Sequence, residues 1–185
     1  MHRFFYFVLY IGSILWKEFR IGELFKIGTG SLLSSEELKT GKIKRVSAKS
    51  FDNGIIGEYD TESNDRARHF ENFISVNFFG DVFYHPYCAS VEMKIHTLKL
   101  KDMDFNNKTG VYFASVIKKS LANKFGYGNQ LSSSKLKEWD FRISVPLLKG
   151  KINFSYMEKF IGNSKHNASR NSKRILWQLD LKIII

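Results

Sequence analysis

Short apolar segments separated by turn residues dominate the first half of the chain. Residues 73–79, 82–84 and 91–100 are rich in aromatic, aliphatic and β-branched side chains, and Gly80 with Asp81 stands between the first two segments. This spacing, with turn residues between the segments, is typical of strands joined by tight turns. The pattern predicts an antiparallel or mixed sheet in this part of the chain.

The clearest helix is predicted over residues 109–125. Lys118, Lys119 and Lys124 lie off its apolar face, so we expect them to face solvent or a ligand. Gly126 stands where the residue that caps the C-terminus of a helix belongs. The apolar side chains that recur four residues apart on one face are Phe113, Ile117, Leu121 and Phe125.

The last part of the domain adds one more strand and one more helix. Residues 141–145 alternate as in a half-buried strand, and Asn153 can cap a helix whose apolar face includes Met157 and Ile161. Together, the segments predict an α+β fold: a single domain with a twisted, mostly antiparallel sheet and a few helices.

The two ends of the chain differ from its middle. We expect residues 1–15 to be an apolar extension, residues 16–161 to form the domain, and residues 162–185 to be a basic and then apolar tail. The apolar start is short for a membrane span and is similar to the apolar part of a signal peptide, without a clean cleavage site. A strand or helix that packs on the domain, or sequence outside the domain proper, is favoured there, and a secreted or membrane-surface protein is the alternative. A single cysteine, Cys88, excludes an internal disulfide and fits a cytoplasmic protein.

Positive charge is concentrated in two segments. The chain has 29 Lys and Arg against 18 Asp and Glu, a net charge of +11. Residues 117–151 hold eight of these cations against two acids, and residues 39–49 hold five cations and no acid. Such a local surplus indicates a face that meets a polyanion, either a nucleic acid such as double-stranded DNA or an anionic membrane surface, although any one lysine is more often part of an ordinary solvated face.

The residue types in these segments indicate how DNA would be bound. Lysine and arginine neutralise phosphates without regard to sequence, whereas amides and planar donors read base edges. An Asn-Gly pair such as Asn53-Gly54 also forms turns for structural reasons alone. The predicted DNA-binding residues are Lys44, Arg45, Lys49, Asn53, Lys118, Lys119, Lys124, Tyr127, Asn129 and Gln130.

Motifs for catalysis are few. A DNA methyltransferase needs a Pro-Pro-aromatic loop and a glycine-rich turn for S-adenosylmethionine, and neither stands in this sequence. Asp81, Glu92 and Lys94 have the loose order of a restriction-nuclease Mg²⁺ site, in which two carboxylates bind the metal and the lysine steadies a water. Such short patterns arise easily by chance, so a Mg²⁺-dependent nuclease is the alternative to a DNA-binding module without a metal or cofactor of its own.

The order of several motifs resembles a known family. The front motifs are Trp16, an apolar segment to Gly30, residues 42–47 and Phe51-Asp52-Asn53-Gly54-Ile55. The later motifs are Tyr127, residues 129–132, residues 135–137, residues 141–146, Gly150 and residues 152–161. In this order they resemble the target recognition domain of the specificity (S) subunit of type I restriction-modification systems, including the recognition subunits of BcgI-like enzymes.

The resemblance implies a non-catalytic role and specific partners. It implies a subunit that directs a DNA methyltransferase, and possibly a restriction subunit, to a target site. It also implies that S-adenosylmethionine and Mg²⁺ are bound by those partners and not by this chain. A complete S subunit resembles two such domains separated by long helices, whereas this sequence has one. The chain is therefore expected to be a half-size subunit, which can form a homodimer, or a recognition module, or a fragment.

Overall fold

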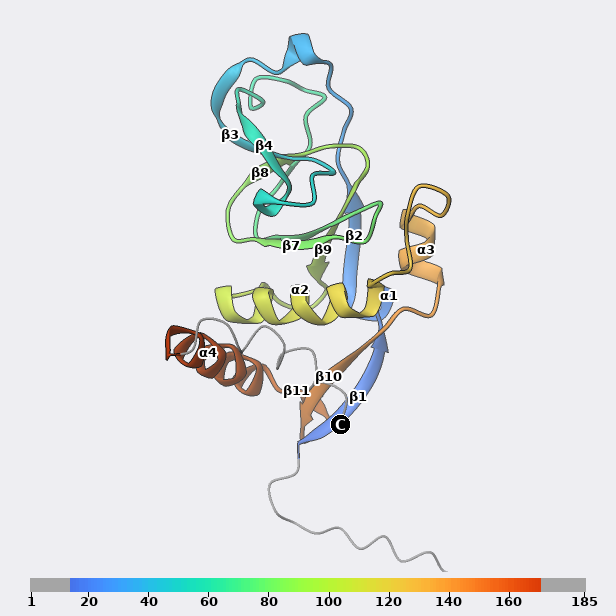
Figure 1. Ribbon diagram of the computed structural model, residues 1–185, viewed down its shortest axis with the longest axis vertical. Helices are drawn as coiled ribbons and strands as arrows, with labels where there is room; N and C mark the ends of the chain where they lie inside the picture. Colours follow the sequence, from blue (N-terminus) through green and yellow to red (C-terminus); the bar gives the residue numbers. More distant parts are fainter. Residues whose placement is uncertain (1–13, 171–185) are drawn as a thin grey trace, which may run out of the picture.

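Helix α2 (Asn107–Leu121) lies at the centre of the computed structural model, which describes residues 14–170 and the side chains up to residue 164. In Figure 1 two small sheets lie above α2, and a third sheet and α4 (Phe154–Arg170) lie below it. Within the described residues the strands form three sheets. The predicted α+β class is confirmed, with the strands shared among these sheets.

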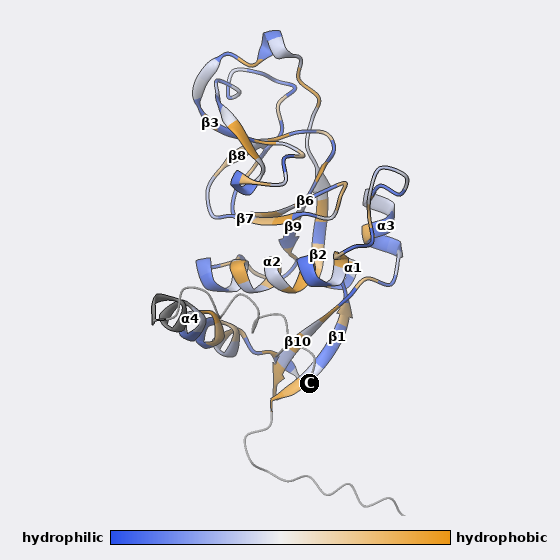
Figure 2. Ribbon diagram, viewed as in Figure 1, coloured by the Kyte–Doolittle hydropathy of each residue, from blue (hydrophilic) through white to orange (hydrophobic). Residues whose placement is uncertain are grey.

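The sheet that packs on α2 contains, in spatial order, β2 (Phe25–Thr29), β9 (Ile95–Leu100), β6 (Phe73–Asn77) and β7 (Val82–His85). Each neighbouring pair is antiparallel. Ile74, Val76 and Leu98 are fully buried and share one apolar core with the α2 side chains. Figure 2 shows apolar residues on β7 and α2 where these two elements lie next to each other.

Local signals fix where α2 begins and how closely it packs. The Asn106 side-chain oxygen accepts hydrogen bonds from the backbone N–H groups of Lys108 and Thr109, at 3.0 Å each, and so caps the helix. At Gly110 an added Cβ would lie 2.3 Å from the ring of Tyr84 on β7. Glycine therefore allows the helix to approach the sheet more closely than a side chain would permit.

Helix α2 ends earlier than the sequence predicts. Its last residue is Leu121, and Asn123 has φ of 58°, a left-handed conformation that leaves the helix. Phe125, which extends the apolar stripe in the sequence, lies in the following loop and packs against Phe141 at 5.6 Å between ring centroids. The prediction that Lys124 shares this helix with Lys118 and Lys119 is therefore wrong.

The second sheet packs against the other face of β6 and β9. Its spatial order is β4 (Ile55–Tyr59), β3 (Thr40–Val46), β8 (Ala89–Val91) and β5 (His69–Phe70). Strands β3 and β8 run parallel, and the other two pairs are antiparallel. Val46, Val91 and Phe73 belong to a second buried cluster between the sheets. Two short 3₁₀ helices flank β3: η1 (Ser35–Glu37) and η2 (Asp52–Gly54), the second being the predicted Asn53-Gly54 turn.

The third sheet joins sequence from the two ends of the described chain. Strand β10 (Arg142–Leu148) pairs antiparallel with β1 (Leu15–Arg20) on one side and with β11 (Lys151–Ile152) on the other. Helix α1 (Ile21–Leu24) follows β1, and helix α3 (Ser133–Glu138) precedes β10. These two short helices contact each other. Helix α4 then continues through residue 162, so the expected domain boundary after residue 161 lies inside a helix.

Residues 1–13 and 171–185 lie outside the described residues. The predictions for most of the apolar extension and for the end of the tail concern these residues. Among the helices that the structure describes, none combines the length and apolar character needed to cross a bilayer.

Arg45 is a buried residue of β3. Its side chain is 2% exposed, and its guanidinium donates hydrogen bonds to the Ser31 carbonyl oxygen at 3.1 Å and to Ser90 Oγ at 3.4 Å. Burial lowers the pKa of Arg45. Because the group lies between strands and not at the surface, it does not fit the DNA contact expected from the sequence.

His85, at the end of β7, is also fully buried. Its ring stacks on Phe73 with 4.7 Å between centroids, and its nitrogens lie 2.8 Å from Ser75 Oγ and 3.1 Å from the Tyr87 hydroxyl. Burial, with a smaller effect of the nearby Lys44 charge, lowers the pKa of His85 from 6.5 to about 4. The neutral imidazole is therefore part of the folded core.

Replacing Arg45 tests its structural role. We expect Arg45→Ala to lower the free energy of unfolding by about 3 kcal/mol, because it removes a packed, buried side chain together with its hydrogen bonds to the Ser31 carbonyl and to the buried Ser90 hydroxyl. The adjacent Lys44→Ala is the matched control. Lys44 lies 4.4 Å over the Tyr87 ring, and its loss should cost less than about 1 kcal/mol. Urea unfolding measures both values, and equal small losses would contradict the buried role.

The buried His85 makes stability depend on pH. Its pKa is about 4 in the folded protein and near 6.5 when unfolded, so the unfolded chain binds the extra proton between these values. The contribution of neutral His85 to the free energy of unfolding is fully present above about pH 6.5. It decreases by about 3 kcal/mol as the pH falls to 4. Unfolding free energies across this range should decrease more steeply for the parent protein than for His85→Gln. Parallel curves would contradict the assignment.

Candidate nucleic-acid interface

The turn between β6 and β7, residues 78–81, is held from one side by the loop after β3. The Asp81 carboxylate accepts a hydrogen bond from Ser50 Oγ at 2.6 Å, and Asn77 Nδ2 donates to the Ala48 carbonyl oxygen at 3.5 Å. Residues 47–54, which include Lys49 and the Asn53 turn, are thereby placed beside the hairpin.

The loop between α2 and α3, residues 122–131, holds the same turn from another side. The backbone N–H of Leu131 donates to the Phe78 carbonyl oxygen at 2.9 Å. The rings of Phe79 and Tyr127 meet edge to face with 5.1 Å between centroids. This hairpin and the loop before α3 can be followed in Figure 1. The β6–β7 turn and the 122–131 loop, which are distant in sequence, therefore lie against each other.

Residues 92–94, between β8 and β9, are the third segment that lies against the β6–β7 turn. Lys94 Nζ lies 5.5 Å from the centre of the Phe78 ring, a cation–π contact that keeps the ammonium at the turn. We call residues 47–54, 78–81, 92–94 and 122–131 together the loop edge. Four segments that are separate in the sequence therefore present lysines, amides and aromatic rings side by side.

The structure brings most of the predicted DNA-binding residues to the loop edge. The residues that lie within it are Lys49, Asn53, Lys124, Tyr127, Asn129 and Gln130. Lys118 and Lys119 lie in the last turn of α2, which leads into the loop. There they also interact favourably with the C-terminal end of the helix dipole. Lys44 lies away from this group on β3, and Arg45 is buried.

The lysines in the loop edge and at the adjacent end of α2 differ in how far other groups already neutralise their charges. Lys49 Nζ pairs with Asp52 at 2.7 Å and lies 4.2 Å over the Phe51 ring, so part of its charge is already neutralised. Lys118 is exposed, and Lys124 is exposed with its ammonium 5.3 Å over the Phe141 ring. The strongest candidates for phosphate contacts are therefore Lys118, Lys124 and Lys94.

Tyr127 occupies the tip of a tight turn. The backbone groups of Gly126 and Asn129 exchange two hydrogen bonds, of 3.2 and 3.1 Å, and leave Tyr127 and Gly128 between them. The Tyr127 side chain is 89% exposed. A large aromatic ring held this far from the core is positioned to contact a partner, since burying its apolar surface is favourable.

Several residues of the loop edge were not predicted as DNA contacts. Phe78 and Phe79 were assigned to a strand, because they continue the apolar segment that forms β6. In the sequence, Lys94 stands out only as part of the alternative Mg²⁺ site. Lys135 lies on α3, outside the loop, and reaches back to it. The only feature of the sequence that marks Lys135 is its place in a basic segment, and Lys137 shares that feature.

The nuclease alternative gains no support from the geometry. The Asp81 carboxylate accepts hydrogen bonds from Ser50 and Asn77, and Glu92 is bonded to the Ser47 hydroxyl. Lys94 is turned over an aromatic ring. Across residues 14–170, no three His, Cys, Asp or Glu side chains are grouped closely enough to hold a metal ion.

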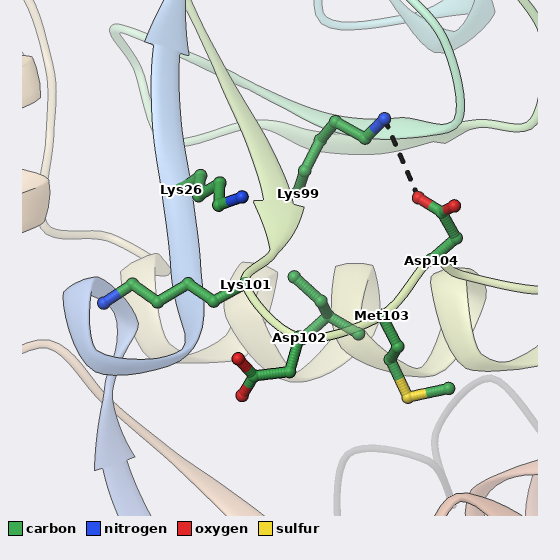
Figure 3. A pocket seen from close by; sticks show the side chains of 7 residues that line it. Lys26, Lys99, Lys101, Asp102, Met103 and Asp104 are labelled. Carbon is green, nitrogen blue, oxygen red and sulfur yellow. Dashed lines mark ion pairs between the residues drawn. The ribbon is translucent and has the colours of Figure 1, made fainter.

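A second basic group lies at the other end of the sheet that packs on α2. Lys26 and Lys99 stand directly opposite each other on β2 and β9, an arrangement that repels. Lys99 lies 3.8 Å from Asp104, and Lys101 points away toward α1, where its ammonium donates to the Gly22 carbonyl oxygen at 2.8 Å (Figure 3). Three lysines and two aspartates line this open pocket of about 350 Å³, so little net charge is left for a polyanion.

The comparisons with known proteins agree on one family. Residues 14–173 match the family described as "Type I restriction modification DNA specificity domain". The chain is 30% identical over 152 residues to the specificity subunit S.BcgI of a type II restriction enzyme from Heyndrickxia coagulans, an alignment that covers 80% of this chain and 43% of that protein.

Solved structures show the same fold. The S subunit of a type I restriction-modification system from M. genitalium superposes with a TM-score of 0.60 at 21% identity, over 87% of this chain and 41% of that one. The HsdS subunit from Thermoanaerobacter tengcongensis gives 0.58 at 11% identity, over 91% and 44%. A structure that describes assembly of a type I system gives 0.55 at 12%, over 94% and 45%.

The chain spans less than half the length of the relatives it matches. The resemblance found in the sequence motifs is confirmed, because the family match covers most of the chain. This chain belongs to the family of type I restriction modification DNA specificity domains.

Proposed function

We propose that this chain is the DNA recognition subunit, or half-subunit, of a restriction-modification system, and that the loop edge is the surface that meets duplex DNA. The convergence of four segments with lysines, amides and exposed aromatic rings carries the proposal. Membership of the specificity-domain family supports it.

The loop edge and the adjacent end of α2 together offer both kinds of contact that recognition requires. Lys118, Lys124 and Lys94 provide charge for phosphates, which gives affinity and orientation without sequence preference. Gln130 and Tyr127, which are exposed at the same edge, can reach base edges and apolar base surfaces in a groove. In this division of roles, the lysines position the module and the loop tip reads the sequence.

The chemistry on DNA would belong to other subunits in the cytoplasm. A methyltransferase subunit would supply S-adenosylmethionine chemistry, and a restriction subunit would use Mg²⁺ to cut. The names of the relatives support this arrangement, since they are specificity subunits of restriction enzymes and restriction-modification systems. Because the chain spans less than half of those relatives, two copies in a homodimer would supply the length of one full subunit.

DNA binding should depend strongly on salt and on the lysines beside the loop edge. We expect the full chain to bind short random duplexes at low salt. The double substitution Lys118→Ala with Lys124→Ala should weaken binding to all duplexes alike by about tenfold or more and reduce the slope of log affinity against log salt by about 2. Gel shifts or fluorescence anisotropy over a salt series measure both quantities.

Lys26→Ala with Lys99→Ala is the matched control, because it removes the same charge from the second basic group. Its effect should be smaller, since charges separated by more than about 10 Å are largely screened at 0.1 M salt. A parent protein that binds no duplex at low salt would contradict the proposed function. Equal losses in the two double variants would contradict the placement of DNA at the loop edge.

A further inference from the structure

Lys135 makes an unusual number of contacts for a surface lysine. Its ammonium donates hydrogen bonds to Asn129 Oδ1 and to the Gln130 carbonyl oxygen, at 2.7 Å each. It also lies 4.9 Å from the centre of the Trp139 ring and 5.9 Å from that of Phe125. Short, charge-assisted hydrogen bonds are among the stronger polar contacts at a protein surface.

We propose that Lys135 is a positioning residue, which fixes the 126–130 turn in the shape that presents Tyr127 and Gln130 to DNA. Its charge then serves the loop and not a phosphate. That the turn contacts DNA rests on the proposed function. That Lys135 holds the turn rests on the hydrogen bonds and ring contacts described above.

The backbone of Lys135 is itself held firmly to the sheet. Ser132 caps α3 and its Oγ accepts a hydrogen bond from the Lys135 N–H at 3.3 Å, while Leu136 is fully buried. His96 on β9 lies 3.0 Å from Ser133 Oγ, so the first turn of α3 is tied to the core. The ammonium therefore reaches the loop from a fixed support.

The same contacts change the role expected for Asn129. Its Oδ1 accepts from Lys135, and its Nδ2 donates to the Lys124 carbonyl oxygen at 3.0 Å. Both ends of this amide are hydrogen-bonded within the protein, one to α3 and one within the loop, so Asn129 braces the turn instead of reading a base. Gln130 and Tyr127 remain exposed at the tip.

A fixed turn matters because glycines flank its tip. Gly126 and Gly128 have open space around their Cα atoms, and glycine loses more conformational freedom on ordering than any other residue. Without Lys135, the turn would lose this conformational freedom only when DNA binds, and the entropic cost would weaken specific binding. Contacts to phosphates elsewhere on the loop edge would be unaffected.

The test compares Lys135→Ala with Lys137→Ala in the full chain. Both changes remove one charge from α3, and Lys137 is exposed two residues further along. Hydrogen–deuterium exchange should become faster across residues 126–131 in Lys135→Ala and stay unchanged in Lys137→Ala. Lys135→Arg, which keeps charge and donors, should restore slow exchange, and far-UV circular dichroism shows whether each variant is folded.

The second readout uses the duplex that the parent selects from a randomised DNA library. The affinity ratio of selected to random duplex should fall by about tenfold or more in Lys135→Ala. Binding of random duplex and its salt slope should match those of Lys137→Ala. A salt slope reduced further than that of Lys137→Ala, with the ratio unchanged, would make Lys135 a phosphate contact and overturn the proposal.

The two readouts also separate this proposal from the proposed function. Exchange that is equally slow in the parent and in Lys135→Ala overturns the positioning role, whatever the DNA result. A parent that binds no duplex, with faster exchange in Lys135→Ala, overturns the proposed function and leaves Lys135 as the residue that holds the turn.

Discussion

The packing of α2 on the β2-β9-β6-β7 sheet determines where the loop edge, the proposed DNA-binding surface, lies. Gly110 brings the helix against the Tyr84 ring, and the buried face of the helix shares one core with β6 and β9. The direction and length of α2 then place its end, Leu121, beside Gly80 in the β6–β7 turn. Because the next loop starts there, residues 122–131 begin beside the β6–β7 turn.

Once this contact is made, a few polar bonds suffice to assemble the loop edge. The Ser50–Asp81 bond attaches one loop to the hairpin, and the Leu131–Phe78 backbone bond attaches another. Each joins residues that are more than thirty positions apart and whose flanking strands or helix are already fixed. The loops are therefore ordered by the sheets beneath them, which is how loops that carry function are generally positioned.

Local signals predicted much of the fold. The turns at Gly80 and Asn53-Gly54 and the apolar stripe of α2 depend on neighbouring residues, so the sequence alone reveals them. The end of α2 was mispredicted because Phe125 continues the stripe by spacing, although a left-handed Asn123 has already ended the helix. The loop edge could be anticipated only in part from the sequence. Lys124, Asn129 and Gln130 are basic or polar in the sequence, but the segments that lie beside them are distant along the chain.

Arg45 and Lys135 show why charge in the sequence is not a count of DNA contacts. Both lie in basic segments, yet one guanidinium is buried between strands, and one ammonium is bonded to a loop. What separates them from Lys118 or Lys124 is the set of acceptors that the fold brings near. These are the Ser31 carbonyl oxygen and the Ser90 hydroxyl for Arg45, and Asn129 Oδ1 and the Gln130 carbonyl oxygen for Lys135. A basic chain can therefore use part of its positive charge to hold a recognition surface in shape and the remainder to attract the polyanion. Sequence specificity would depend on the first part, and overall affinity on the second.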